Sequence, residues 1–181
     1  MGASGWSYYT PYQQDIAQAL QELRQRVFEA GDYQQYWLYN EVPEEVFEEL
    51  DELEPQAWRQ PGQQLVEAFA HVLERKHLSA DLPPAPQTID EALQRNGPDG
   101  THSILDIDHI ASRPEEGAAS PLPRETLLKL FGTERPTRAI IEEGRAANSV
   151  YGVLPTWQAM YVMVYQDDSP SEIFFSGSSG D

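Results

Sequence analysis

Apolar side chains recur at helical spacing in two stretches of the first half of the chain. The first stretch predicts a helix over residues 12–30 with Gly31 as its C-terminal cap, and its apolar stripe consists of Ile16, Leu20, Leu23 and Val27. The second predicts a helix over residues 62–77, and its core-facing side chains are Leu65, Phe69, Val72 and Leu73. Both stripes require a partner surface, so the first half should fold as packed helices.

A third apolar stripe lies between these two helices, inside a run of acidic residues. Eight acids and no base stand between Glu41 and Glu54. Pro43 suits the first turn of a helix and Pro55 ends it. The predicted buried side of this helix is formed by Val42, Val46, Leu50 and Leu53. The acids fill the remaining surface, so we expect one side of the helix to be strongly negative.

The second half of the chain favours strands. A period of two predicts an interior strand over residues 101–110. Segments 157–165 and 171–175 are rich in β-branched and aromatic residues, which predicts a C-terminal β-hairpin. Residues 6–9 predict a further short strand, and the expected helices of this half are 123–130 and 137–143. We therefore predict an α+β fold in which helices pack on one face of a small, mainly antiparallel sheet.

The length of the chain favours one domain. Its 181 residues bury enough surface for a core without crosslinks, so we expect a single α+β domain over residues 1–176. Residues 1–97 form its helix-rich part, residues 98–176 its strand-containing part, and residues 177–181 have the composition of a flexible tail. The absence of cysteine, of a signal-peptide pattern and of a run of about 20 apolar residues predicts a cytoplasmic location.

The net charge restricts the class of partner. Thirty acidic and twelve basic side chains give a formal charge of −18. Such a field repels nucleic-acid phosphates and anionic lipid headgroups and attracts basic proteins. We therefore expect neither direct nucleic-acid binding nor membrane binding, and a basic protein as the partner. The oligomeric state has no signature in the sequence.

The strongest candidate for chemistry is a cluster of one histidine and two carboxylates. On a strand over residues 101–110, His102, Asp106 and Asp108 would project from the same face. Such a set could bind a divalent metal, or His102 could act as a base oriented by an aspartate, as in a small hydrolase or transferase. The competing interpretation is a solvated strand surface, because an Asp-x-Asp triplet is common.

Other catalytic and cofactor motifs are missing from the sequence. It contains no Gly-x-Ser-x-Gly nucleophile elbow, no cysteine nucleophile and no glycine-rich phosphate-binding loop. We therefore predict no cofactor, and a binding role is favoured over an enzymatic one.

A binding surface is predicted where aromatic residues adjoin the acidic run. Interfaces favour tyrosine and tryptophan as anchors, and surrounding charge speeds the encounter with an oppositely charged partner. The predicted anchors are Tyr36, Trp37 and Tyr39, and the predicted steering charges are Glu44, Glu45, Glu48, Glu49 and Glu52. An immunity protein or antitoxin that blocks a cationic toxin, or a protein that mimics DNA, would have this profile. The alternative is that the aromatic residues are core and the acids are a solvated helix face.

Overall fold

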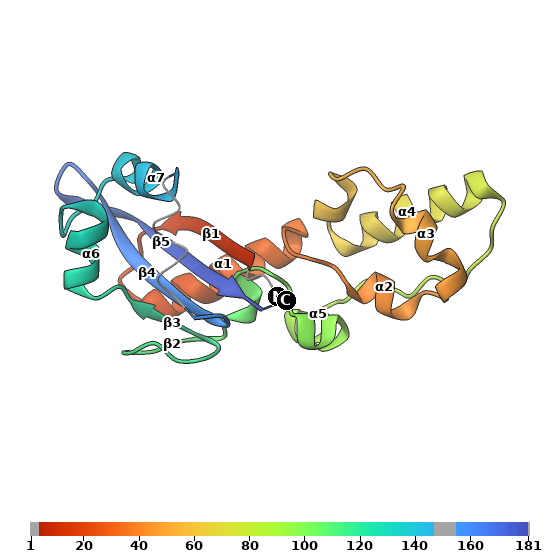
Figure 1. Cartoon of the computed structure of the whole chain (residues 1–181), viewed down its shortest axis with the longest axis horizontal. Coiled ribbons are helices and arrows are strands. Elements are labelled where there is room, and N and C mark those ends of the chain that lie inside the picture. Colours follow the sequence, from red (N-terminus) through yellow and green to blue (C-terminus); the bar gives the residue numbers. More distant parts are fainter. Residues whose placement is uncertain (1–3, 147–154, 181) are drawn as a thin grey trace. The chain divides into compact units, whose positions relative to one another are not determined.

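Two compact units make up the computed structural model, which describes residues 4–146 and 155–180. The sheet unit comprises residues 1–23 and 102–181, and the helical unit comprises residues 24–101 (Figure 1). The helical unit thus ends close to the expected boundary at residue 97. The sheet unit, however, also contains the amino-terminal residues, because the first strand pairs with the last one. Within the described residues, no helix is long and apolar enough to cross a membrane.

The sheet unit is built on five strands in the order β1-β5-β4-β3-β2. β1 and β4 pair with β5 antiparallel, whereas β3 pairs parallel with both β4 and β2. The parallel pairing of β3 and β4 fits the long connection between them, which contains α6 (Arg124–Phe131) and α7 (Arg138–Ala146). The strands are β1 (Ser4–Pro11), β2 (His109–Ile110), β3 (Ala118–Pro121), β4 (Gln158–Gln166) and β5 (Ser169–Ser179). The α+β class and the mainly antiparallel sheet are confirmed.

The predicted C-terminal hairpin is formed by β4 and β5 (Figure 1). Its turn is tighter than the segment between the two predicted strands, because only Asp167 and Asp168 separate the paired residues Gln166 and Ser169. Both aspartates have positive φ, 49° and 62°, as a two-residue turn of type I′ requires. Aspartate tolerates this conformation better than most residues.

Most of the expected flexible tail over residues 177–181 is instead the end of β5, which lies between β1 and β4. Gly177, Ser178 and Ser179 pair with β1, and the first two also pair with β4. A Cβ atom on Gly177 would lie 2.3 Å from the ring of Trp6, and the Trp6 indole N–H donates to Ser179 Oγ at 3.1 Å. The small residues that suggested a tail are needed here because the Trp6 ring lies directly against the strand.

Hydrophobic residues fill both faces of the central strands. α6 (Arg124–Phe131) and α7 (Arg138–Ala146) cover one face through a cluster that includes Phe131, Ile141, Val162 and Phe174. Alternation along β5 places Ile173 and Phe175 on the opposite face, and both are fully buried as well. The predicted packing of helices on one face is therefore only part of the arrangement, because the opposite face of β5 is buried as well.

The helical unit has its own hydrophobic core. Its longest complete helix, α4 (Gly62–Lys76), matches the predicted helix, and the residue that caps its C-terminus, His77, adopts the left-handed conformation. The other helices are α2 (Trp37–Glu41), α3 (Phe47–Leu50), α5 (Ile89–Asn96) and the 3-10 helices Glu44–Val46, Ala57–Arg59 and Gly97–Asp99. α1 (Ile16–Ala30) begins in the sheet unit and ends in the helical unit.

The predicted acidic helix is broken into short pieces, but its buried stripe is confirmed. Val42, Val46, Leu50 and Leu53 all belong to the core of the helical unit, together with Phe69 of α4. The backbone between residues 41 and 54 passes through a 3-10 helix and the single turn of α3, and a bend follows Glu41. The apolar spacing thus predicted which side chains are buried, although no single helix carries them.

The predicted strand over residues 101–110 is wrong for most of its length. Residues Ile104–Asp106 form a 3-10 helix, and only His109 and Ile110 pair as β2. Ser103 caps this helix, because its Oγ accepts from the backbone N–H of Leu105 at 3.1 Å while Asp106 accepts from the N–H of Ser103. This local capping box competes with extended backbone, and apolar periodicity alone did not reveal it.

Candidate functional site

The exposed acids of the helical unit are the first component of the candidate site. Glu44 and Glu45 lie in the 3-10 helix after Pro43, and Glu48 lies in α3. All three are exposed, and none forms an ion pair with another described residue. Their charges are therefore compensated by no direct contact within the described part of the chain.

Three further acids of this run, Glu41, Glu49 and Glu52, are less available to a partner. Glu52 pairs with Lys76 of α4 and approaches Arg75 at 4.0 Å, and the hydrogen bond from Lys76 to Glu52 raises the pKa of the lysine. Glu41 is likewise held by Arg95 of α5. Glu49 is half-buried. Fewer acids of this run are therefore both exposed and unpaired among the described residues than the sequence predicted.

Trp37, predicted as an anchor, belongs to the core. It is fully buried at the start of α2, and the Arg95 guanidinium carbon lies 4.7 Å from its ring centroid. The guanidinium in turn bonds to Glu41. A partner could reach Trp37 only if this part of the unit opened, so its assignment as an anchor is corrected. The prediction relied on the closely spaced aromatic residues Tyr36, Trp37 and Tyr39, and this spacing does not indicate which ring faces the core.

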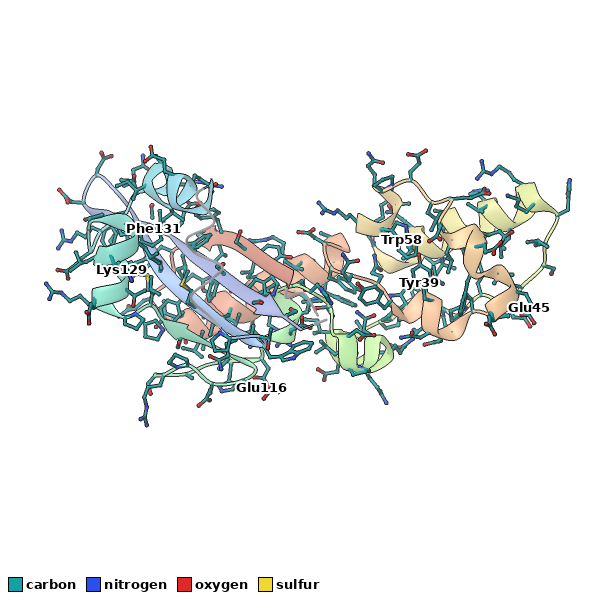
Figure 2. The ribbon with its side chains drawn as sticks, viewed as in Figure 1. Tyr39, Glu45, Trp58, Glu116, Lys129 and Phe131 are labelled. Atoms are coloured by element: carbon teal, nitrogen blue, oxygen red, sulfur yellow. The ribbon has the colours of Figure 1, made fainter. Side chains whose placement is uncertain are left out.

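Tyr39 and Trp58 form the accessible aromatic pair. Their rings stack with centroids 5.0 Å apart and an interplanar angle of 2°, and both residues are half-buried (Figure 2). The Tyr39 hydroxyl donates to Asp51 Oδ1 at 3.2 Å. Burial, followed by the negative charge of Asp51, raises the pKa of Tyr39 to about 12, so its hydroxyl stays protonated at neutral pH.

Sequence reasoning missed Trp58. It lies in the short 3-10 helix Ala57–Arg59, between Pro55 and Pro61, where no apolar period marks an element. A large aromatic side chain in a proline-flanked turn itself indicates a partly exposed ring. Turns lie at the surface, and a short turn cannot bury a whole tryptophan side chain by itself.

A hollow adjoins this aromatic pair. We call it the Trp58 hollow; it measures about 200 Å³, and its lining residues are Gln34, Gln35, Tyr36, Tyr39 and Trp58. Gln35 is 1% exposed, and its Nε2 donates to the backbone oxygens of Trp58 and Gln60 at 3.0 and 2.9 Å. Its Oε1 is buried without a hydrogen-bond partner among the described residues. The hollow therefore has aromatic walls, whereas the Gln35 oxygen is closed off from solvent and would lie 3.5 Å from a Cβ atom on Gly62.

The alternative site of His102, Asp106 and Asp108 was predicted from a regular strand over residues 101–110. Because that strand is not formed, the three side chains do not share a strand face. Asp106 accepts from Ser179 Oγ at 2.7 Å and caps its own 3-10 helix, while Asp108 is exposed and binds the His109 ring. His102 is half-buried with a φ of 50°. No group of three or more His, Asp or Glu side chains within residues 4–146 and 155–180 is arranged to hold a metal ion.

His109 instead sits between two carboxylates. Its Nδ1 contacts Asp108 and its Nε2 lies 2.7 Å from Glu115, at the exposed start of β2. The hydrogen bond to Asp108, followed by that to Glu115, raises the pKa of His109. This arrangement joins β2 to the loop that precedes β3.

Comparisons with protein-family models, with curated proteins and with solved structures find no match for this chain.

Proposed function

We propose that the chain is a protein-binding module whose helical unit holds a basic protein partner, in the manner of an immunity protein or antitoxin that blocks a cationic toxin. The observation that carries the proposal is that Glu44, Glu45 and Glu48 are exposed and pair with no residue in the described part of the chain, within the same compact unit that presents Tyr36, Tyr39 and Trp58. The glutamates supply attraction, and the partly exposed rings supply the contact area.

Electrostatics supports a basic protein as the partner. The helical unit contains sixteen acidic and six basic residues, so its whole field is negative. Charges of this kind raise association rates with a positive partner, and they act over about 8 Å at physiological ionic strength. The same field opposes binding to nucleic acid, whose phosphates are negative.

The anchor set of the proposal differs from that predicted by the sequence. Tyr36 and Tyr39 remain in it, and Trp58 takes the place of the buried Trp37. Of the steering charges, Glu49 and Glu52 contribute less, because the first is half-buried and the second is paired with Lys76. No cofactor takes part in this function.

The test uses two charge-reversal variants with the same net charge. In the first, Glu44, Glu45 and Glu48 are changed to Lys. In the control, the exposed Glu116, Glu125 and Glu143 of the sheet unit are changed to Lys. A partner is isolated from native cells on the immobilised chain at low salt and identified, and its association rate is then measured at several ionic strengths.

We expect the first variant to slow association by about tenfold or more and to flatten its dependence on salt, whereas the control retains most of both. Equal losses in the two variants would show that only net charge matters. A partner that binds both variants at the rate of the unchanged chain would remove the proposal.

A further inference from the structure

We infer that Asn96 is a site of self-modification, whose side-chain amide is converted to a carboxylate when the helical unit opens, and that the carboxylate then keeps the unit from re-forming. Asn96 and Gly97 make the only Asn-Gly step in the chain, and they stand at the end of α5. The modification itself is independent of the proposed function. Only its effect on partner binding rests on that function.

The reaction needs these two residues and water. The backbone nitrogen of Gly97 loses its proton to solvent base and attacks the side-chain carbonyl carbon of Asn96. The bond from that carbon to the amide nitrogen breaks, the nitrogen takes up a proton and leaves as ammonia, and a cyclic succinimide remains. Water then opens the ring at either carbonyl, which gives aspartate or its β-linked isomer. Glycine favours the attack, because it has no Cβ to crowd its nitrogen.

The folded unit holds the nucleophile. The Gly97 N–H donates to the backbone oxygen of Leu93 as the C-terminal cap of α5, so its proton is not free to leave. Apart from this bond the residue is accessible, since Gly97 is exposed and no described atom lies within 4 Å of the place where a Cβ would stand. α5 has eight residues, and a helix of this length is marginal without tertiary support. Opening of α5 therefore suffices to expose the nitrogen to solvent.

The folded unit also holds the side chain under attack. Asn96 is fully buried, its Oδ1 accepts one hydrogen bond at 3.0 Å, and its Nδ2 donates two, at 2.6 and 2.9 Å. The three partners are backbone groups of Trp37, Gln34 and Gly100. Rotation of the amide toward the Gly97 nitrogen breaks these bonds, so conversion should follow local opening of the helical unit.

The product does not fit the closed unit. A carboxylate at position 96 still accepts from the Trp37 N–H, but a negative oxygen replaces the donating amide nitrogen. In the closed unit this oxygen would face the backbone oxygens of Gln34 and Gly100 at a fully buried position. A buried charge that faces two acceptors is strongly unfavourable. The β-linked isomer also lengthens the main chain by one atom, so each product keeps the unit open.

Conversion would end partner binding. Gln34 and Trp37, whose backbone groups Asn96 holds, lie on either side of Gln35 and Tyr36 in the sequence. Tyr36 is one of the proposed anchors, and an open unit no longer holds it in place. Asn96 thus limits the lifetime of the binding-competent chain, because each opening of the unit exposes it to an irreversible reaction.

Two matched glycine variants of the full chain test the dependence on opening. Gly31→Ala disturbs the helical unit, because the added Cβ would lie 1.9 Å from the backbone oxygen of Gln60. Gly177→Ala disturbs the sheet unit in the same manner, at 2.3 Å from the Trp6 ring. Conversion at Asn96 is followed by mass spectrometry of proteolytic peptides during incubation in weakly alkaline buffer, with and without concentrated urea.

We expect unfolding in urea to speed conversion by more than about tenfold, and Gly31→Ala to speed it similarly without urea, because the rate follows the open fraction of the helical unit. Gly177→Ala should leave the rate unchanged. In urea, Gly97→Ala should slow conversion, because the added methyl group crowds the attacking nitrogen. Equal rates in the folded and unfolded chains, or equal acceleration by Gly31→Ala and Gly177→Ala, would overturn the inference.

The variant Asn96→Asp tests the product directly. Its control, Asn40→Asp, adds the same charge at an exposed side chain that donates to the backbone oxygen of Arg95. We expect Asn96→Asp to speed hydrogen exchange of the α4 and α5 amides by more than about tenfold and to leave β4 and β5 unchanged. The control should exchange like the unchanged chain. A helical unit that is as well protected in Asn96→Asp as in the unchanged chain contradicts the inference.

The same variant separates the inference from the proposed function. If Asn96→Asp opens the helical unit and the partner still associates at its usual rate, the modification stands and the helical binding surface is refuted. If the unit stays closed in Asn96→Asp while the triple reversal of Glu44, Glu45 and Glu48 slows association, the self-modification is refuted and the binding module stands.

Discussion

The side-chain oxygen of Asn96, at the end of α5, accepts a hydrogen bond of 3.0 Å from the backbone N–H of Trp37, at the start of α2. Asn96 is fully buried, and its amide nitrogen donates to the backbone oxygens of Gln34 and Gly100 at 2.6 and 2.9 Å. The Asn96 side chain thus links α5 to the backbone of Gln34, Trp37 and Gly100. Two of these partners are neighbours in sequence of Gln35 and Tyr36, which line the Trp58 hollow.

Asn96→Ala should destabilise the helical unit by about 3 kcal/mol, because it removes three hydrogen bonds and leaves buried backbone groups unsatisfied. Amide hydrogen exchange in α4 and α5 reports this loss separately from the sheet unit. The control is Asn40→Ala, since Asn40 is exposed and donates one bond to the backbone oxygen of Arg95. We expect it to cost less than about 1 kcal/mol. Similar losses for the two variants would contradict this account of Asn96.

Gly31→Ala should cost more than Gly97→Ala. Both glycines have positive φ, 67° and 70°, and the ψ of −149° at Gly97 lies in a region that almost only glycine adopts, so alanine is strained by about 1–3 kcal/mol at either position. At Gly31 the added Cβ would also lie 1.9 Å from the backbone oxygen of Gln60, whereas at Gly97 nothing lies within 4 Å. We expect a loss above about 4 kcal/mol for Gly31→Ala and of about 1–3 kcal/mol for Gly97→Ala in urea unfolding. Equal losses would show that the backbone near Gln60 yields at little cost.

A chain ending at Ser176 should have a less stable sheet unit than one ending at Ser179. The longer form keeps the pairing of Gly177–Ser179 with β1 and the bond from Trp6 to Ser179, and the shorter form exposes the Trp6 ring. We expect a loss of about 2–4 kcal/mol, measured by hydrogen exchange of the β4 and β5 amides. Indistinguishable exchange in the two forms would restore the interpretation of these residues as a tail.

His109 should make a small contribution to stability that depends on pH. Because Asp108 and Glu115 raise its pKa in the folded chain, the contribution is fully present below the unfolded value of about 6.5 and is lost as the pH rises through the folded pKa. Asp108→Asn should lower the pKa of His109 most and Glu115→Gln less, as followed by NMR titration of its ring protons. Glu116→Gln is the control, and an equal shift in this variant would indicate a general field effect.

The sequence predicted those features that depend on neighbours along the chain. α4, most of α1 and the hairpin of β4 and β5 follow from apolar spacing and from residues that tolerate positive φ, such as Gly31 and Asp168. The stripe from Val42 to Leu53 is buried as predicted even though its helix is interrupted. Hydrogen bonds within a helix and the conformation of a turn are local, so local patterns suffice to predict them.

The candidate site was predicted only in part, because the burial of its rings and the pairing of its acids depend on residues that are distant in the sequence. The sequence located the acids and the tyrosines, but Trp37 is enclosed by the core while Trp58, from a turn, supplies the accessible ring beside Tyr39. Likewise, Glu52, in the turn after α3, is neutralised by Lys76 at the end of α4.

The amino-acid sequence by itself therefore determined the apolar stripes, the turns and the strong acidity of this protein. The tertiary structure decided that Gly177–Ser179 complete β5 against Trp6, and that Gln35 and Trp58 border one hollow. These outcomes depend on contacts between residues far apart in the chain. The free energy of such contacts comes from burial against whichever surface the fold brings near, and periodicity along the sequence does not specify that surface.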